Sequence, residues 1–271
     1  MTQNPLGKST QYISQYAPEL LFAIPRSEKR DELEYEFLNF NGQDIWNAYE
    51  ISWINLKGLP QIAVGVFRID ADSEFIVESK SLKLYLNSFN QTAFKDVQAV
   101  VETITRDLSR AVAKDVQVQL YSPQDISCMP IGKLKGELLD SLDIQIDQYS
   151  YSPELLENSV DSEQLVEESL VSHLLKSNCL ITSQPDWASI QITYQGAKID
   201  REKLLGYLIA FRSHNEFHEQ CVERVFCDIK KYCSPQKLTV YARYTRRGGL
   251  DINPWRSDFE TAVDNIRLIR Q

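Results

Sequence analysis

The sequence lacks long apolar runs, and this absence argues against a membrane protein. Its longest purely apolar stretch, residues 20–24, is far shorter than the roughly 20 residues that a membrane-spanning helix needs. The first residues, MTQNPLGKST, also lack the apolar segment of a signal peptide. We therefore expect a cytoplasmic protein that has no membrane partner.

Cysteine is scarce and forms no recognisable pattern. The five cysteines, at positions 128, 179, 221, 227 and 233, contain no Cys-x-x-Cys pair. An odd number of cysteines without a signal peptide is typical of free thiols in a reducing compartment, so a disulfide scaffold is excluded. We expect Cys221, Cys227 and Cys233, which fall within one helical stretch, to be small packed hydrophobic residues.

An excess of basic residues is also missing. The chain has 29 Lys and Arg against 38 Asp and Glu, a net charge of −9, whereas a surface that binds nucleic acid normally carries clustered positive charge. We therefore expect no direct nucleic-acid partner. Residues 136–175 contain ten acids and no Lys or Arg, which predicts an acidic connector whose charged side chains face solvent.

What the sequence does contain is a weak internal repeat, in which residues 78–94 align with residues 200–217. The matching pairs at an offset of 122 residues are Tyr85 and Tyr207, Leu86 and Leu208, and Phe89 and Phe211. The identities are few, but the same order of expected elements follows in both copies. A repeat of this kind indicates two modules of one fold.

Apolar periodicities predict the same elements in each copy, namely two strands, a short helix, a longer helix and a final strand. In the first copy these cover residues 50–55 and 61–69, a helix from Ser79, a helix over 94–112 and a strand over 116–120. In the second copy they cover residues 179–182 and 189–194, a helix capped by Asp200, a helix capped by Asn215 and a strand over 238–244.

This order of elements predicts an α+β protein with two tandem antiparallel-sheet modules that carry their helices on one face. We expect an N-terminal module with its extension over residues 1–135 and a C-terminal module over residues 176–271. The acidic connector, residues 136–175, lies between them.

The two copies differ at polar positions. The second copy has a thiol, an acid and an imidazole, at Cys179, Asp186 and His218, where the first copy has Lys57, Val64 and Lys95. This difference is consistent with one site built between the two halves. It is equally consistent with a purely structural divergence of the copies.

Cys179 and Asp186 form a chemically suggestive pair. They flank a Ser-Gln-Pro turn, so a hairpin brings the acid back towards the thiol. An accessible thiolate is a good nucleophile, and a nearby carboxyl group can deliver or accept a proton, especially if Trp187 forms an apolar wall that raises its pKa. The alternative is a buried structural cysteine and an acid that only shapes the turn.

Histidine is scarce and forms no zinc motif. His214 and His218 are spaced to share one helix face, but Asn215 stands where a zinc protease has glutamate, and His173 is the only other histidine. We therefore expect no metal site. The plainer interpretation of His218 and Glu219 is an exposed pair at the start of a helix.

A Gly-x-Gly-x-x-Gly motif after a predicted strand is missing, so a Rossmann-type cofactor site is not supported. The run Arg246-Arg247-Gly248-Gly249 follows the end of a strand instead. Two guanidinium groups beside flexible backbone suit an anionic group such as a phosphate. The alternative is a charged turn.

Together these segments resemble one family, the NADPH-dependent 7-cyano-7-deazaguanine reductases, or QueF family, in its long two-module form. The resemblance is carried by ESKSLK from Glu78, Cys179 with Asp186, the Phe-His-Glu of residues 217–219, RRGGLDINP from Arg246 and DIWNAYE from Asp44. No single segment is decisive, but their ordered combination is specific and extends over most of the chain.

The resemblance implies the tunnelling fold (T-fold), in which sheet-and-helix modules assemble around purine- or pterin-like ligands, and it implies a homodimer. It further implies reduction of the nitrile of 7-cyano-7-deazaguanine to 7-aminomethyl-7-deazaguanine in the biosynthesis of queuosine, a modified tRNA nucleoside. Family members use two NADPH, and no metal takes part in the chemistry.

The resemblance also implies residue roles. Cys179 attacks the nitrile carbon to form a covalent thioimide, Asp186 protonates the nitrile nitrogen, and His218 assists proton movement. A first hydride gives a thiohemiaminal that collapses to an imine and frees Cys179, and a second hydride gives the amine. The implied substrate-binding residues are Glu78, Ser79, Lys80, His218 and Glu219. The implied NADPH-binding residues are Lys80, Ser81, Arg247 and Gly248.

Two other functions fit the same fold. A zinc-dependent cyclohydrolase-like enzyme would use Cys179 and His218 as metal ligands, but it needs a third ligand near them that the sequence does not identify. A non-catalytic purine-binding T-fold protein requires an inert Cys179.

Overall fold

The computed structural model describes residues 12–125 and 129–271. The chain divides into two compact units. The N-terminal unit consists of Met1–Glu28, Asp44–Pro130 and Arg246–Asp251, and the C-terminal unit consists of Lys29–Gln43, Ile131–Thr245 and Ile252–Gln271. Each unit therefore combines segments that are far apart in the chain.

The sheet of the N-terminal unit contains β2 (Asn41–Ile54), β3 (Pro60–Asp70) and β5 (Gln117–Tyr121), in the order β5-β3-β2. The turn between β2 and β3 is held by Asn55, whose side-chain oxygen accepts hydrogen bonds from the N–H groups of Lys57 and Leu59. Gly58 adopts a φ of +79° in this turn, a conformation that glycine tolerates better than other residues. The predicted hairpin and the final strand of the first copy are confirmed.

The helices of the N-terminal unit are α2 (Ser79–Asn87) and α3 (Val97–Val112). Asp96 caps α3 by accepting a hydrogen bond from Ala99 N–H, and this cap explains why the helix begins at Val97 rather than at the predicted residue 94. The buried residues of α3 include Val100, Ile104, Leu108 and Val112, which recur every four residues and so form one helix face.

Short elements complete the N-terminal half of the chain. A two-stranded ribbon pairs β1 (Ala23–Pro25) with β4 (Phe75–Val77) in antiparallel orientation. The short helical segments are η1 (Pro18–Leu20), α1 (Ser27–Arg30) and η2 (Tyr35–Phe37).

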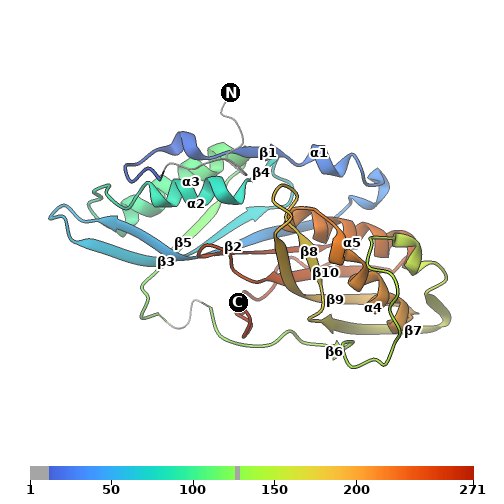
Figure 1. Ribbon diagram of the computed structural model, residues 1–271. Helices are drawn as coiled ribbons and strands as arrows, with labels where there is room; N and C mark the ends of the chain where they lie inside the picture. Colours follow the sequence, from blue (N-terminus) through green and yellow to red (C-terminus); the bar gives the residue numbers. More distant parts are fainter. Residues whose placement is uncertain (1–11, 126–128) are drawn as a thin grey trace. The chain divides into compact units, whose positions relative to one another are not determined.

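The sheet of the C-terminal unit contains β7 (Val160–Ser172), β9 (Pro185–Ile199), β10 (Lys237–Tyr244) and β11 (Leu250–Ser257), which pair antiparallel in this order (Figure 1). The short strand β8 (Lys176–Asn178) pairs with the beginning of β9. At the other side β6 (Glu137–Leu138) adds to β7 in parallel orientation.

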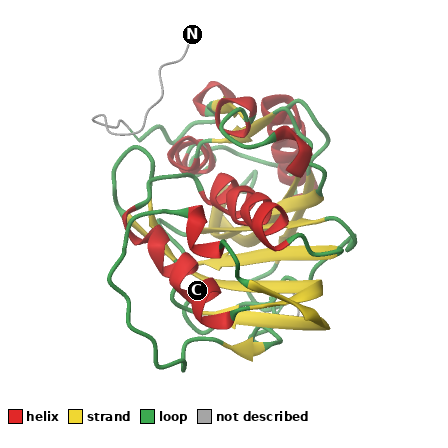
Figure 2. Cartoon of the chain, turned by 90° about the vertical axis from the view of Figure 1, so that its right-hand side faces the viewer, coloured by secondary structure: helices red, strands yellow, loops and turns green. Residues whose placement is uncertain are grey.

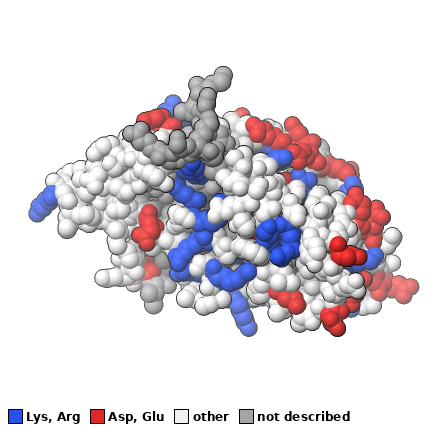
Figure 3. All heavy atoms as spheres, viewed as in Figure 1, with Lys and Arg blue, Asp and Glu red and all other residues white. Residues whose placement is uncertain are grey.

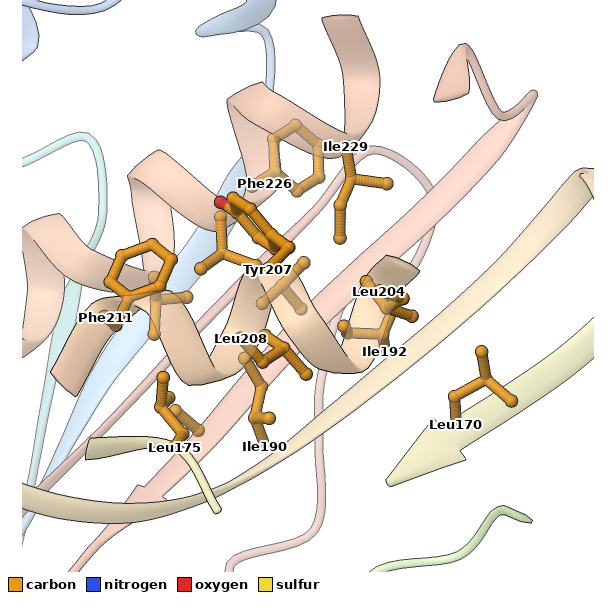
Figure 4. Close-up of a cluster of buried hydrophobic side chains, with 14 of the residues drawn as sticks. Leu170, Leu175, Ile190, Ile192, Leu204, Tyr207, Leu208, Phe211, Phe226 and Ile229 are labelled. Atoms are coloured by element: carbon orange, nitrogen blue, oxygen red, sulfur yellow. The ribbon is translucent and has the colours of Figure 1, made fainter. Parts of the chain in front are cut away.

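The helices of the C-terminal unit are α4 (Arg201–Ala210) and α5 (His218–Cys233), with the short segments η3 (Pro153–Leu156) and η4 (Phe211–Ser213). Helices lie on one face of the strands (Figure 2). Tyr207 and Leu208 of α4 and Phe226 of α5 pack with Ile190 and Ile192 of β9 in the main core cluster (Figure 4). The predicted α+β class is confirmed.

The opposite face of β10 is also covered, which the sequence pattern did not predict. All of residues 238–244 are buried, although their alternation predicts one solvated face. Tyr241 donates a hydrogen bond to Asp264 O (3.0 Å), and Arg243 donates to the side chains of Asn265 (2.7 Å) and Gln271 (3.0 Å). The C-terminal segment therefore covers the side of the strand that carries these polar residues.

The repeat is confirmed by a shared pattern of buried hydrogen bonds. In each unit two tyrosine hydroxyls donate to one carboxylate oxygen of a single aspartate. In the N-terminal unit Tyr16 and Tyr85 donate to Asp107, with O–O distances of 2.6 and 2.8 Å. In the C-terminal unit Tyr151 and Tyr207 donate to Asp228, with O–O distances of 2.9 and 2.6 Å. Equivalent networks in both units indicate two copies of one structural module.

The acidic segment 136–175 contains β6, η3 and β7. Its acids are exposed, except for the half-buried Asp140 and Glu168, so the predicted solvated charge is confirmed. Acidic side chains gather on the side of the C-terminal unit where β7 lies (Figure 3). Along the described residues, no helix combines the length and the apolar character needed to cross a membrane.

Candidate active site

Cys179 lies in the connection between β7 and β9, directly after β8. The N–H group of Cys179 donates to Gln184 O (2.9 Å), and that of Ser183 donates to Cys179 O (3.0 Å), so residues 179–184 form a closed turn. The predicted strand over 179–182 is therefore wrong, because β8 ends at Asn178. Only 8% of Cys179 is exposed, so the residue is largely shielded from solvent.

Asp186 lies near the beginning of β9, opposite Ser177 of β8. Since Cys179 is hydrogen-bonded across the turn to Gln184, Cys179 and Asp186 occupy diagonally related positions of one hairpin, which confirms the predicted hairpin. Asp186 is buried, and its Oδ2 lies 3.3 Å from Nε2 of His218. An imidazole and a carboxyl group at this separation can exchange a proton.

Trp187 does not form the expected wall beside the Asp186 carboxyl group. Neighbouring residues of a strand point to opposite faces of the sheet, and Trp187 is 40% exposed whereas Asp186 is buried. The guanidinium group of Arg212 lies 5.6 Å from the centre of the Trp187 ring. This expectation was wrong because strand alternation separates adjacent side chains.

His218 is the first residue of α5, and its ring stacks on Tyr244, with ring centres 3.8 Å apart and planes inclined by 8°. His214 lies before the helix and pairs with Glu216 at 3.0 Å. The expectation that His214 and His218 share one helix face is therefore wrong. The helix begins only after Phe217, which contributes no side-chain cap.

Asn215, which the sequence predicts as the cap of this helix, has another function. Its side-chain N–H donates to Ser183 Oγ (2.9 Å), and its side-chain oxygen accepts from Asn178 (3.0 Å). The backbone of Asn178 also bonds to His214 O and Glu216 N (2.8 and 3.0 Å). These bonds join both ends of the Cys179 turn to the segment between α4 and α5.

Three buried polar atoms near the Asp186–His218 pair have no hydrogen-bond partner within the described residues. They are Oγ of Ser177, Nδ1 of His218 and the hydroxyl oxygen of Tyr244. Leaving a buried polar group unpaired costs about 1–3 kcal/mol. The hydroxyl groups of Ser177 and Tyr244 lie close to each other, so Nδ1 of His218 is the group for which a ligand is expected to supply the missing partner.

Sequence reasoning missed Ser177, Tyr244 and Gln220, whose buried amide oxygen and nitrogen also have no hydrogen-bond partner in the described chain. No motif marks these residues. The only available signal was the alternation of the final strand, which correctly places Tyr244 on the same face as Leu238 and Val240.

The other described cysteines differ from Cys179. Cys221, Cys227 and Cys233 are buried on α5, which confirms their predicted packing role. Burial raises the pKa of the Cys221 and Cys227 thiols to about 12 and also raises the pKa of Cys233. These thiols therefore remain protonated at neutral pH and are poor nucleophiles. Cys128 lies outside the described residues.

Glu219 follows His218 in the first turn of α5 and is 2% exposed. The positive end of the helix dipole stabilises a carboxylate at this position. The C-terminal unit thus brings Cys179, Asp186 and His218 together and carries Glu219 next to them in the chain.

The N-terminal unit holds the remaining predicted residues. Glu78 is buried and caps α2, and its two carboxylate oxygens accept hydrogen bonds from the N–H groups of Lys80 and Ser81 (both 2.8 Å). A carboxylate has about four acceptor positions, so two remain for another donor. Ser79 and Lys80 are half-buried, whereas Ser81 is buried, and its hydroxyl bonds to Glu78 O and Phe22 N (2.7 and 3.0 Å).

The loop of Arg247 and Gly248 lies against α2 in the same unit. Gly248 and Gly249 have φ angles of +60° and +81°, and a Cβ atom at Gly248 would lie 3.2 Å from the Lys83 side chain. Arg246 lies over the ring of Tyr49 at 5.0 Å. Cations beside exposed left-handed glycine backbone provide both charge and N–H groups for phosphate oxygens, so these residues fit a phosphate-bearing cofactor.

Metal-binding residues do not gather in the described chain. No group of three or more His, Cys, Asp or Glu side chains within residues 12–125 and 129–271 is arranged to hold a metal ion.

Comparison with known proteins identifies related families over most of the chain. Residues 12–120 match the family described as "Nitrile reductase, 7-cyano-7-deazaguanine-reductase N-term", and residues 185–262 match the family described as "QueF-like protein". These segments contain every predicted site residue except Cys179, which lies just before the second match. A solved structure described as "Crystal structure of the archaeosine synthase QueF-Like in the apo form" is similar at 17% identity and a TM-score of 0.32, covering 38% of this chain and 100% of that chain.

Proposed function

Because the chain belongs to the QueF family of nitrile reductases, in its two-module form, we propose that it reduces 7-cyano-7-deazaguanine to 7-aminomethyl-7-deazaguanine with NADPH. This reaction belongs to the biosynthesis of queuosine. Family membership supports the nitrile-reductase reaction and the queuosine pathway, and the residues of this chain support the more specific mechanism.

The Asp186–His218 pair beside the Cys179 turn is the observation that carries the proposal. Nitrile carbon is electrophilic, and Cys179 is the one described cysteine outside the buried face of α5. A thiol needs a partner that accepts its proton, and the nitrile nitrogen needs a partner that donates one. The carboxyl group of Asp186, which lies 3.3 Å from the imidazole of His218, can perform both transfers.

Cys179 and Asp186 account for the bonds and protons of the covalent step. The S–H proton of Cys179 passes to Asp186, Sγ forms a bond to the nitrile carbon, one π bond of the nitrile breaks, and Asp186 delivers a proton to the nitrogen. The product is a thioimide on Cys179. The carbon–sulfur bond breaks later, after the first reduction, and returns Cys179 for the next substrate, while His218 replenishes the proton of Asp186.

Glu219 and Glu78 are proposed to accept hydrogen bonds from the N–H edge of the deazaguanine ring. Both carboxylates are buried, at 2% and 1% exposure. A buried acceptor favours ligands that donate a hydrogen bond to it, because a ligand that leaves the acceptor unpaired loses about 1–3 kcal/mol of binding free energy. Ser79, Lys80 and His218 are proposed as the further substrate contacts.

Lys80, Ser81, Arg247 and Gly248 are proposed to hold NADPH, which when bound supplies one hydride, so that conversion of a nitrile to an amine requires two molecules of NADPH bound in turn. The cations and the left-handed glycine backbone suit its phosphates. For Ser81 the helix start is the available contribution, since its hydroxyl bonds to Glu78 O and Phe22 N and its backbone N–H donates to the Glu78 carboxylate.

We also propose the T-fold for each unit and a homodimer for the protein. The support is the antiparallel sheet with helices on one face in each unit, together with the edge position of β5. Sedimentation equilibrium tests the homodimer, which requires a mass of twice the 31.3 kDa of one chain.

Intact mass spectrometry provides the decisive test of the proposed function. The wild-type protein is mixed with 7-cyano-7-deazaguanine in the absence of NADPH, beside the variants Cys179→Ala and Cys221→Ala. We expect one adduct of substrate mass in the wild type and in Cys221→Ala, and none in Cys179→Ala. Adding NADPH should then convert the nitrile to the amine.

A folded wild-type protein that forms no adduct contradicts the thioimide mechanism. Stoichiometric zinc in such a sample, measured by inductively coupled plasma mass spectrometry, would favour the cyclohydrolase-like alternative. Tight binding of the purine without adduct, turnover or metal would favour the non-catalytic alternative.

A further inference from the structure

Tyr244 lies flat against His218 without belonging to any recognised motif. The centres of the two rings are 3.8 Å apart, and their planes differ by 8°. Tyr244 is completely buried, at 0% exposure. A phenol ring that lies parallel to an imidazole at van der Waals distance restricts rotation of the imidazole about its side-chain bonds.

This contact matters because His218 lacks the usual means of fixing its ring. Histidines that transfer protons are normally oriented by a hydrogen bond to the second ring nitrogen. Nε2 of His218 faces Asp186, whereas Nδ1 is buried without a hydrogen-bond partner in the described residues. The stacked ring of Tyr244 therefore provides the orientation that a second hydrogen bond would otherwise provide.

The position of Tyr244 follows from the register of two strands. Tyr244 is the last residue of β10 and lies opposite Ala188 of β9. Ala188 is two residues beyond Asp186 and so points to the same face of the strand. Because residues opposite each other on neighbouring strands also share a face, the small Ala188 side chain leaves room for the Tyr244 ring beside Asp186.

The backbone around Tyr244 is held from two sides. Thr245 N–H donates to Trp187 O (2.9 Å), and the side chain of Gln271 donates to Tyr244 O (2.9 Å). The ring thus stands on a rigid strand end, while His218 reaches it from the beginning of α5. Such a support restricts a partner side chain without contacting substrate itself.

The hydroxyl group of Tyr244 does not explain its position. The hydroxyl group is buried beside the side chains of Cys221 and Ser177 without a hydrogen bond of good geometry, and burial raises the pKa of Tyr244 well above its usual value, so the phenol stays neutral. A role for the ring requires only an aromatic face. Phenylalanine should therefore replace Tyr244, whereas an aliphatic residue such as leucine should not.

We propose that Tyr244 is a positioning residue whose ring holds the imidazole of His218 in the orientation that directs Nε2 to Asp186 and leaves Nδ1 available to the reacting substrate. This inference rests on the proposed function, since it assigns His218 a part in proton transfer during nitrile reduction. Tyr244 acts through His218 and touches neither substrate nor cofactor in this assignment.

A double-mutant cycle on the full-length protein tests the inference. The variants are Tyr244→Phe, Tyr244→Leu, His218→Ala and the double variant Tyr244→Leu/His218→Ala. Adduct formation is followed by rapid quench and intact mass without NADPH, and turnover is followed with NADPH. Thermal unfolding of each variant measures its stability separately.

We expect Tyr244→Phe to stay within about twofold of the wild type, since the stack is kept. Tyr244→Leu should lower adduct formation and kcat by roughly 10- to 100-fold, part of the range for general acid–base groups, with little change in KM. The double variant should be no slower than His218→Ala, because a residue that acts only through His218 has no further effect once His218 is removed.

A matched control separates positioning from general loss of packing. Tyr194→Leu removes another fully buried tyrosine from the same sheet, on β9, and Tyr194 bonds to Glu168 and Ile199 rather than to the site. We expect this control to lower the unfolding temperature without the loss of kcat seen in Tyr244→Leu.

A second measurement observes the imidazole without turnover. In protein labelled with ¹³C-histidine, the ring signal of His218, identified by its absence in His218→Ala, should be displaced by the ring current of Tyr244. The displacement should persist in Tyr244→Phe and disappear in Tyr244→Leu. An unchanged signal in Tyr244→Leu overturns the inference, even if that variant folds poorly enough to lose activity.

The remaining outcomes are also distinguishable. Additive rate losses in the double variant, or equal losses in Tyr244→Phe and Tyr244→Leu, reject the role of Tyr244 while the proposed function stands. A wild-type protein that forms no adduct and oxidises no NADPH rejects the proposed function, and it rejects the reaction role of Tyr244 with it.

Discussion

The two copies of the repeat differ most in the connection between their first two strands. In the N-terminal unit a turn held by Asn55 joins β2 to β3. In the C-terminal unit the connection between β7 and β9 is longer and contains β8, Cys179 and the turn that follows it. The sheet and helices are common to both copies, whereas Cys179 occurs where the second copy has additional chain, and Asp186 directly follows it at the beginning of β9.

The two copies also differ in how their long helices, α3 and α5, begin. Asp96 caps α3 with a side-chain hydrogen bond, whereas α5 begins after Phe217, which provides none. A cap of this kind is worth about 0.5–2 kcal/mol. The second copy thus lacks this stabilising cap at the helix that begins with His218 and Glu219.

The largest expected effect comes from Asp186, which aligns with the apolar Val64 of the first copy. Asp186→Asn keeps the shape of the side chain but removes its ability to donate and accept a proton, so we expect turnover to fall by roughly 10²- to 10⁴-fold. Steady-state kinetics measures this loss, and circular dichroism checks the fold. A variant with wild-type turnover would show that the difference between the copies at this position is structural.

The shared tyrosine–aspartate networks test whether the copies are equivalent where they look alike. Asp107→Ala and Asp228→Ala should each destabilise the protein by about 2–4 kcal/mol, because each leaves a fully buried tyrosine hydroxyl, that of Tyr85 or Tyr207, without its acceptor. Urea unfolding measures both values. A large effect in only one unit would mean that the conserved pattern no longer has the same function in both.

Glu216 of the C-terminal unit, which pairs with His214 and Arg224, makes a pH-dependent contribution to stability. Burial alone would raise the pKa of Glu216, but hydrogen bonds from His214 and Arg224 outweigh it and lower the pKa below the usual 4.5. The stabilisation by Glu216 is therefore complete above about pH 4.5 and is lost as the pH falls through the lower, folded-state value.

Unfolding free energies of wild type and Glu216→Gln between pH 6 and pH 3 measure this contribution. We expect the difference between them to be largest at pH 6 and to shrink towards pH 3. Glu163→Gln, which changes an exposed acid of β7, is the control and should show no such trend. A difference that grows as the pH falls contradicts the assignment.

The smallest expected effect is that of the α3 cap. Asp96→Ala should lower the free energy of unfolding by about 1 kcal/mol, and it should leave the rate of adduct formation at Cys179 unchanged. Asp200→Ala, which removes the corresponding cap of α4, should behave alike. Urea unfolding together with intact mass spectrometry checks both expectations, and a slower adduct in Asp96→Ala would tie this cap to the reaction.

Much of each unit could be predicted because local patterns report local structure. Alternation located β3, β5 and β10, and residues recurring every three or four positions located α3 and α5. Asp200 was correctly identified as a cap, since its side chain bonds to N–H groups two and three residues ahead. Asn215 has the same capping chemistry, but distant partners, Asn178 and Ser183, engage its side chain instead.

By itself, then, the sequence determined the α+β class and the hairpin that carries Cys179 and Asp186, because each depends on residues that are close in the chain. It also determined the repeat, because the two copies keep the same local patterns. Only the tertiary structure decided that His218 reaches Asp186, that Tyr244 stacks beneath it and that both faces of β10 are covered. These features depend on strand register and on contacts between segments up to tens of residues apart. Periodicity carries no information about such contacts, since it reports that a side chain is buried without identifying the group that buries it.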